Sequence, residues 1–242
     1  MRLVSWNCKG AFHRKHEFAA ELRPDILIVP ECKKLSEIPQ SLFHPAPKSF
    51  LWFGDNPSKG LAVFCYGDYS LNLHPSYDAR FRWIVPLVIS GATDFTLFAV
   101  WTLPVEESKS YVRPLIDAYS HYKPLMQNSR FVWAGDFNAN FIWDKPSRKF
   151  KFCDFVALLS EHDSHSVYHH QTDCRHGEEV DNSFYQYHHA DKGYHIDYVF
   201  ATDSMRPHGS KITFGSYQDW SKRSDHMPVI CDFFERPDSK AT

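Results

Sequence analysis

Acidic, amide and histidine side chains stand where hydrophobic segments of this chain begin or end. Gly135-Asp136-Phe137-Asn138 follows one apolar run, and Ser224-Asp225-His226 precedes another. Carboxylate oxygens can hold a hard divalent cation, the cation can neutralise a phosphate, and a neighbouring histidine can carry a proton or donate a hydrogen bond to a phosphorus intermediate. The two motifs together therefore indicate a metal-assisted phosphoesterase.

Two further segments place polar side chains at predicted strand ends. Asn7 closes the first strand, within Trp6-Asn7-Cys8-Lys9-Gly10, and Glu31 follows the second. Each motif alone has an ordinary structural explanation, because Gly-Asp-x-Asn is common in Asx-type turns and an isolated glutamate is usually a helix cap or a solvated loop acid. Their chemical interpretation depends on their occurrence together.

Taken in order, the strings W-N-x-x-G, P-D-I-L-I-x-x-E, G-D-F-N, H-I-D-Y and S-D-H resemble the endonuclease/exonuclease/phosphatase superfamily, which includes deoxyribonuclease I and exonuclease III. The resemblance spans residues 2–234. It implies a four-layer α/β sandwich, in which two β-sheets pack face to face with helices outside and the active site lies at one end of the sheets. It also implies hydrolysis by in-line attack of an activated water.

The resemblance implies Mg²⁺ or Mn²⁺ as cofactor. Glu31 would be the principal metal ligand, Asn7 a secondary or water-mediated ligand, and Asp225 would lie near the metal. A single carboxylate plus waters suits Mg²⁺, which keeps much of its hydration shell. Many exonuclease III-like members carry an acid two residues after the first-strand asparagine. This chain has Lys9 there, which favours a single tight metal site.

The resemblance also implies the catalytic roles. Asp136 would orient or deprotonate the attacking water, and Asn138 would donate a hydrogen bond to the phosphate or position the aspartate. Asp197 would accept the second N–H of His226, whose other nitrogen would stabilise charge developing on phosphorus.

The basic and aromatic residues beside these motifs are candidates for substrate binding. Residues 141–152 interleave aromatic and cationic side chains, which suits a nucleic-acid strand with cations on phosphates and rings on bases; core aromatics beside a solvated face are an equal alternative. Family members place a Tyr or His after the strand that ends near Trp101, and that role could pass to Trp101, Thr102 or neither. The candidates are Lys9, Lys33, Lys59, Trp101, Trp143, Lys145, Arg148 and Lys149.

The formal net charge of −2 gives no overall attraction to nucleic acid, so binding would need a local basic patch. We expect a nucleic-acid phosphodiesterase that acts on DNA rather than RNA. A phosphatase or phosphodiesterase for a small phosphorylated molecule or a lipid head group is the first alternative, although the P-A-W-x-D-R string of inositol phosphatase relatives is absent. A non-catalytic nucleic-acid-binding module is the second. The sequence leaves endonuclease or exonuclease action and abasic-site recognition open.

The chain has 242 residues and no linker-like segment, which predicts one domain over residues 1–234 and a tail over 235–242. Residues 2–6 enter a strand without a signal-peptide pattern, and the cysteines lack paired spacing. No apolar stretch approaches the roughly 20 residues of a membrane span. We therefore expect a cytoplasmic monomer with no membrane association and no obligate protein partner.

Hydrophobic patterning predicts mixed α/β structure. Eight of the fifteen histidines fall within residues 162–195, and we favour a polar, mobile insertion there over a second metal site because the spacings match no zinc pattern. Strands are predicted over 2–7, 25–30, 61–66, 83–89, 95–101, 131–135, 196–201 and 228–234, and helices over 12–23, 108–125 and 152–160.

Overall fold

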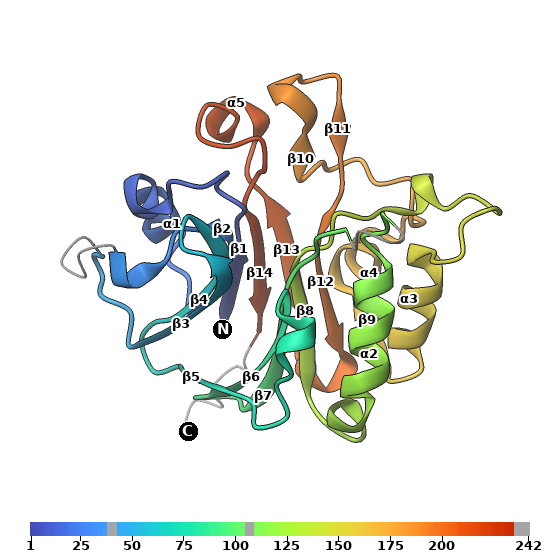
Figure 1. Cartoon of the computed structure of the whole chain (residues 1–242), viewed down its shortest axis with the longest axis horizontal. Coiled ribbons are helices and arrows are strands. Elements are labelled where there is room, and N and C mark those ends of the chain that lie inside the picture. Colours follow the sequence, from blue (N-terminus) through green and yellow to red (C-terminus); the bar gives the residue numbers. More distant parts are fainter. Residues whose placement is uncertain (38–42, 105–108, 235–242) are drawn as a thin grey trace, which may run out of the picture.

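The structure is a computed structural model that describes residues 1–37, 43–104 and 109–234. Two six-stranded sheets pack face to face (Figure 1). The first sheet contains, in spatial order, β13 (Ser210–Phe214), β14 (Val229–Phe233), β1 (Arg2–Ser5), β2 (Ile26–Cys32), β4 (Lys59–Cys65) and β3 (Ser49–Asn56). The second contains β5 (Ser70–Leu73), β6 (Ile84–Ser90), β7 (Phe95–Trp101), β8 (Phe131–Asp136), β12 (Asp197–Thr202) and β9 (Ser164–Ser166).

The helices are α1 (His16–Glu21), α2 (Arg113–Met126), α3 (Phe152–Ser160), α4 (Val167–Thr172) and α5 (Tyr217–Trp220). Helix α1 covers the outer face of the first sheet and α2 and α3 that of the second, whereas α4 packs against β12 and β13 and α5 lies at the upper end of the sheets in Figure 1. A third, two-stranded sheet stands above the same end of the two sheets in Figure 1 and consists of β10 (Phe184–Tyr185) and β11 (Gly193–Tyr194). Across the three described ranges, no helix has the length and apolar character needed to cross a membrane.

Strand alternation explains the layering. Leu3 of β1 lies in the core between the two sheets, whereas the next residue, Val4, packs into the outer cluster of hydrophobic residues on the first sheet. In β7, Leu97 likewise faces the core between the sheets and Phe98 faces the layer that contains α2 and α3. Because both faces are buried, the central strands are almost continuously apolar. The predicted four-layer sandwich is confirmed.

Several predicted element boundaries are wrong. The helix expected over 12–23 is divided into a 3-10 turn, Phe12–Arg14, and α1, and the left-handed conformation of Ala11 marks the start of that turn. The helix expected from residue 108 begins at Arg113, with Pro114 in its first turn, and continues past Pro124 to Met126. Residue 108 itself and the predicted tail, 235–242, lie outside the described residues.

Candidate active site

Asp136 and Asp197 face each other across two antiparallel strands. Asp136 is the last residue of β8, Asp197 is the first of β12, and the two are directly paired in register. Both side chains point to the inner face of the second sheet, because Ala134 and Val199, two positions away on the same strands, face the core between the sheets. Both carboxylates are almost completely buried, with 1% of each residue exposed. Two acids in such positions repel each other unless a cation or a proton lies between them.

His226 lies between these two carboxylates. Its Nδ1 lies 2.9 Å from Asp197 Oδ2, and its Nε2 lies 3.9 Å from Asp136 Oδ2. The Trp6 indole N–H donates to the His226 carbonyl at 3.0 Å, and the Ser224 hydroxyl accepts from the His226 backbone N–H at 3.1 Å. Segments that are distant in the chain thus hold together Asp136, Asp197 and His226, which we name the catalytic cluster after the role predicted for them.

The electrostatics of the catalytic cluster favour a protonated histidine. Burial opposes the charge on His226, but the nearby carboxylates of Asp197 and Asp136 outweigh burial and raise the pKa of His226 to about 9. Burial, followed by the charge of Asp197, raises the pKa of Asp136 to about 7. A cationic histidine that donates hydrogen bonds and a carboxylate that titrates near neutrality are suited to acid–base chemistry.

Gly135 permits the close strand packing that places Asp136. Its φ is +141°, and a Cβ built there would lie 1.9 Å from the carbonyl oxygen of Val100 on the parallel strand β7. No side chain can occupy that space without moving the backbone. The glycine of the Gly-Asp string is therefore required by the contact between β7 and β8.

Asn138 is the third residue of the Asx-type turn that the side chain of Asp136 closes. Its backbone N–H donates to Asp136 Oδ1 at 3.0 Å, and its amide donates to the Thr102 carbonyl at 3.2 Å. Asn138 has a positive φ of 48°, as do two other candidate residues, Lys9 at 52° and Glu31 at 60°. Left-handed non-glycine residues cost about 1–3 kcal/mol each and often cluster at functional sites.

A β-bulge aims the side chain of Glu31. The register between β2 and β4 shifts between Val29 and Cys32, and both residues pack on the outer face of the first sheet although they are three positions apart. The extra residue turns Glu31 out of the regular alternation. The Asn7 amide donates to Asp136 Oδ2 at 3.0 Å and lies 3.4 Å from Glu31 Oε1, so Asn7 links Glu31 to the catalytic cluster.

Glu31 and Asp225, the two carboxylates predicted to lie at the metal, each pair with a lysine. Lys59 Nζ lies 3.1 Å from Glu31 Oε2, and Lys9 Nζ lies 2.9 Å from Asp225 Oδ2. Burial raises the pKa of Asp225, but the hydrogen bond from Lys9 and the charges of His226 and Lys9 outweigh it and lower that pKa overall. Carboxylate and amide oxygens are the donors that Mg²⁺ and Mn²⁺ prefer. Glu31 and Asp225 offer such oxygens, whereas the Asn7 side-chain oxygen accepts from the Lys9 backbone N–H at 3.0 Å and its NH2 faces Glu31.

The catalytic cluster also brings three ligand atoms within 4.8 Å of one another. However, the Nδ1 of His226 already bonds Asp197, and a histidine with a raised pKa is a poor ligand because metals bind the neutral imidazole. The metal-ligand roles of Glu31, Asn7 and Asp225 stay predictions.

Comparison of the sequence with models of protein families gives no match, and comparison with curated proteins gives none either. Solved structures do match. The 3′ phosphatase NExo from Neisseria, bound to a product DNA hairpin, has a TM-score of 0.71 at 17% identity, and the match covers 97% of this chain and 100% of that chain. An AP endonuclease from Archaeoglobus fulgidus has a TM-score of 0.68 at 20% identity, with the same coverage. Truncated TDP2 from Caenorhabditis elegans has a TM-score of 0.66 at 11% identity, and the match covers 97% of both chains.

The chain has the deoxyribonuclease I-like fold. The fold implied by the five motifs is therefore confirmed. In this deoxyribonuclease I-like chain, the catalytic cluster forms where β8 ends and β12 begins, beside the segment that leads into β14.

A cavity of about 390 Å³ adjoins Asn138. Two predicted substrate-binding residues, Trp143 and Arg148, line it, while Lys145 and Lys149 do not. The Trp143 ring packs 5.3 Å from that of Tyr194. The other polar or aromatic side chains of its wall are Lys109, Tyr111, Asn140, Asp144, Phe184, Gln186 and Tyr194.

Trp101 and Thr102 are poorly placed for contact with a substrate. Trp101 is 2% exposed and belongs to the core between the sheets, with its ring 4.8 Å from that of Trp83. Thr102 is completely buried. Neither residue is therefore expected to take the role of the phosphate-contacting Tyr or His of family members, which was the third of the three alternatives. The substrate-binding role predicted for Trp101 is wrong, because its ring is buried in the core. The ring of Trp101 instead supports Lys59, whose Nζ lies 5.4 Å away.

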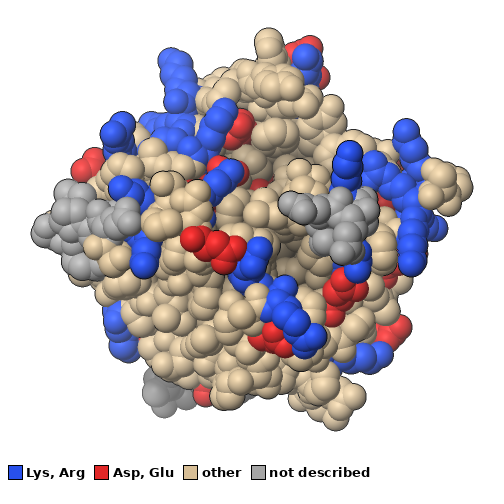
Figure 2. All heavy atoms as spheres, viewed as in Figure 1, with Lys and Arg blue, Asp and Glu red and all other residues tan. Residues whose placement is uncertain are grey.

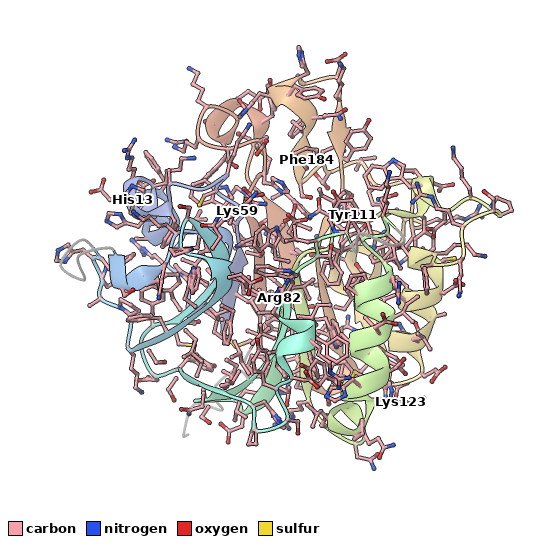
Figure 3. All side chains as sticks on the ribbon, in the orientation of Figure 1. His13, Lys59, Arg82, Tyr111, Lys123 and Phe184 are labelled. Atoms are coloured by element: carbon pink, nitrogen blue, oxygen red, sulfur yellow. The ribbon has the colours of Figure 1, made fainter. Side chains whose placement is uncertain are left out.

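Basic side chains flank the site on two sides. Figure 2 shows Lys and Arg gathered on either side of a hollow at the upper end of the sheets. Lys9 and Lys59 are exposed, with 51% and 49% of their side chains accessible to solvent, and Lys33 is half-buried. Figure 3 shows Lys59 on one side of that end and Phe184 and Tyr111 on the other. The substrate-binding roles of these residues stay predictions.

Sequence reasoning missed two residues that build the site. Phe184 packs its ring 4.7 Å from His226, and a β-bridge joins the two backbones. The buried Ser183 hydroxyl accepts from the backbone N–H groups of Ile196 and Asp197 at 3.0 and 2.9 Å. Neither residue lies in a motif, because their roles come from the return of β10 to the catalytic cluster.

Proposed function

We propose that this protein hydrolyses phosphodiester bonds in nucleic acid, with DNA preferred over RNA and with Mg²⁺ or Mn²⁺ as cofactor. The arrangement of Asp136, His226 and Asp197 carries this proposal, because it supplies a base and a protonated donor at one end of the sheets. The similar structures of an AP endonuclease and of a 3′ phosphatase bound to DNA support the substrate class.

In the mechanism that we propose, Asp136 accepts a proton from the attacking water as the water oxygen bonds to phosphorus. The phosphorus–oxygen bond on the opposite side breaks, and the departing oxygen takes up a proton from solvent. Asn7 and the backbone N–H of Asn138 hold the two oxygens of Asp136 in place, and its raised pKa of about 7 makes it an effective base near neutral pH. Glu31, with Asn7 and Asp225, would hold the divalent cation, whose charge would neutralise the phosphate.

His226 stabilises charge as it develops on the phosphoryl oxygens. Asp197 accepts a hydrogen bond from His226 Nδ1–H at 2.9 Å. This bond fixes the orientation of the ring and directs Nε2–H toward Asp136. Because the ring is protonated below about pH 9, its Nε2 can donate a charge-assisted hydrogen bond across the neutral range. The ring of Phe184 covers one side of the imidazole and limits its solvation.

The test is an activity panel with purified protein. End-labelled duplex, single-stranded, abasic, 3′-phosphorylated and RNA oligonucleotides are incubated with Mg²⁺ beside inositol phosphates, with Asp136→Asn as the inactive control. We expect Mg²⁺-dependent cleavage of DNA. Turnover confined to the small phosphates would replace this proposal with the small-molecule phosphatase, and binding without turnover would favour the non-catalytic module. The cytoplasmic location, the monomeric state and the lack of an obligate partner stay predictions.

A further inference from the structure

A second histidine–carboxylate group lies on the other face of the second sheet. His169 of α4 meets His176 and Glu179 of the segment that follows it, and the three offer ligand atoms that lie within 4.8 Å of one another. We name these three residues the outer cluster. His176 stacks on Phe141 at 4.5 Å, and its ring lies parallel to that of Phe200, which belongs to the layer beneath α2 and α3. Asp197, by contrast, faces inward from the same strand as Phe200.

Glu179 is a buried carboxylate with several donors. Only 4% of its side chain is exposed, and Oε1 lies 3.0 Å from His169 Nε2. Its Oε2 accepts from the Gly177 backbone N–H at 3.0 Å and from the Asn140 amide at 3.1 Å. Burial raises its pKa, but these hydrogen bonds outweigh burial and lower the pKa to about 2. The group is therefore an anion at neutral pH.

His176 is a neutral imidazole with an unused nitrogen. Its ring lies face to face with that of His169, with centroids 3.5 Å apart. Its Nδ1 is buried and has no hydrogen-bond partner among the described residues. Burial and the neighbouring His169 lower the pKa of His176 to about 3. Burying such a polar atom without a partner is costly, at about 1–3 kcal/mol, which indicates that this nitrogen is available to a ligand.

His195 brings a third imidazole close to the outer cluster. Its residue is 2% exposed, and its ring centroid lies 6.0 Å from that of His169. Nδ1 lies 2.8 Å from the Asp181 carbonyl, so Nδ1 carries the proton and Nε2 keeps a lone pair. Within the described part of the chain, that Nε2 is also buried without a partner. A histidine whose other nitrogen donates to a backbone carbonyl is typical of metal sites.

We propose that His169, His176 and Glu179 bind a transition-metal cation of the zinc type, with the nearby His195 as an additional nitrogen donor. Two imidazoles and one carboxylate are a known zinc ligand set and suit Mg²⁺ poorly. Binding requires the proton between His169 Nε2 and Glu179 to leave. It also requires the His176 ring to turn out of its parallel stack, because a metal ion lies near the plane of each imidazole that binds it.

The cation would have a structural role beside the catalytic segment. Glu179 holds the amide of Asn140, and the Asn140 side-chain oxygen accepts from the backbone N–H of Ile142. Asn140 follows the catalytic Asn138 by two residues. A metal ion in the outer cluster would therefore fasten α4 and the segment after it to the loop that forms the wall of the cavity, without contacting the reacting atoms.

The test measures metal binding rather than activity. Metal-stripped full-length protein is titrated with Zn²⁺ by calorimetry in excess Mg²⁺, which occupies the oxygen site, and with Co²⁺ as a visible probe of nitrogen coordination. We expect one tight equivalent of Zn²⁺ and a rise in Tm. His176→Ala and Glu179→Gln should each weaken binding at least about tenfold, as expected when one metal ligand or its partner is removed.

His170→Ala is the matched control, because His170 is the neighbouring histidine on the same helix and does not belong to the outer cluster. It should bind Zn²⁺ like the wild type, and circular dichroism confirms that each variant is folded. If His176→Ala and Glu179→Gln keep the affinity and stoichiometry of His170→Ala, or if no variant binds Zn²⁺ tightly, the site is refuted and the outer cluster is a hydrogen-bonded packing element. Loss of nuclease activity would not affect this outcome, since Zn²⁺ binding is measured directly.

Discussion

The catalytic cluster and the outer cluster contain the same residue types in opposite proportions. Two carboxylates surround one histidine in the first, and two histidines surround one carboxylate in the second. The pKa of His226 rises to about 9, whereas that of His176 falls to about 3. Burial lowers the pKa of both histidines; it prevails at His176, where Glu179 opposes it only in part, and the two carboxylates outweigh it at His226.

This difference separates two kinds of chemistry. The excess of carboxylates keeps His226 protonated, which suits it to donate hydrogen bonds to a phosphate and makes it a poor metal ligand. Burial, with a further contribution from His169, keeps His176 neutral and leaves its lone pair available, while Glu179 stays ionised at a pKa of about 2. The ratio of acids to histidines, rather than their presence, distinguishes a charge-stabilising site from a nitrogen-rich metal site.

The largest expected effect comes from removing the catalytic cluster. His226→Ala and Asp136→Asn should each reduce turnover of an oligonucleotide by ~10²-fold or more, and Asp197→Asn by less. Because burial disfavours the charge of Asp136, Asp136→Asn should melt at or above the wild-type temperature at pH 8. Replacement of the exposed His208 is the control. Unchanged turnover in folded variants would place the chemistry elsewhere.

The next effect concerns the metal. Chelation should abolish activity, and Glu31→Ala should raise the Mg²⁺ concentration needed for half-maximal rate by ~10-fold or more, because it removes the principal carboxylate ligand. Mg²⁺ titration of the rate measures this shift, with Glu17→Ala on the surface of α1 as the control. Full activity of Glu31→Ala in excess chelator would show that the oxygen site is not the metal site.

A smaller effect should follow from charges that lie outside both clusters. Replacing Lys145, Arg148 and Lys149 together with Ala should raise KM for an oligonucleotide several-fold and reduce its salt slope by roughly one unit for each phosphate that is no longer neutralised. The replacement of Arg148 should contribute most to the rise in KM, since among these three residues only Arg148 lines the cavity. Turnover of bis-nitrophenyl phosphate should hardly change. Lys123→Ala, at the far end of the sheets in Figure 3, is the control, and equal losses on both substrates would indicate damage to the scaffold.

The smallest effect is the pH dependence of stability in the outer cluster. The lowered pKa of Glu179 stabilises the fold above about pH 4.5, and this stabilisation is lost as the pH falls toward 2. The lowered pKa of His176 destabilises the fold below about pH 6.5, because the unfolded chain then binds a proton more readily than the folded protein does. In metal-free protein, Glu179→Gln should lower the Tm at pH 7 by roughly 2–4 °C, which corresponds to a loss of about 1 kcal/mol in the free energy of unfolding. The difference in Tm between this variant and the wild type should narrow as the pH falls toward 3.

Exposed Glu178 supplies the control for that measurement, as Glu178→Gln. A gap between Glu179→Gln and wild type that stays constant from pH 7 to pH 3 would show that the charge of Glu179 does not contribute to stability. The comparison between the two clusters would then lose its electrostatic basis.

The sequence by itself determined where the core strands lie along the chain and which polar residues stand at their ends. Alternating apolar residues commit a strand to fixed faces, so a polar residue directly after such a run, such as Asp136, lies at the edge of a sheet. The edge strands β3, β5 and β13 were not predicted. The strands β5 and β13 have only four and five residues, and their exposed sides carry polar residues that resemble loops.

The tertiary structure decided what each polar residue contacts. A β-bulge redirects Glu31, the core between the sheets buries Trp101, and the return of β10 places Phe184 against His226. The sequence favoured a polar, mobile insertion over residues 162–195, yet His169 and His195 pack inside the protein. Protonation and ligand capacity depend on burial and on partners distant in the chain, and those are set only when the sheets and helices pack together.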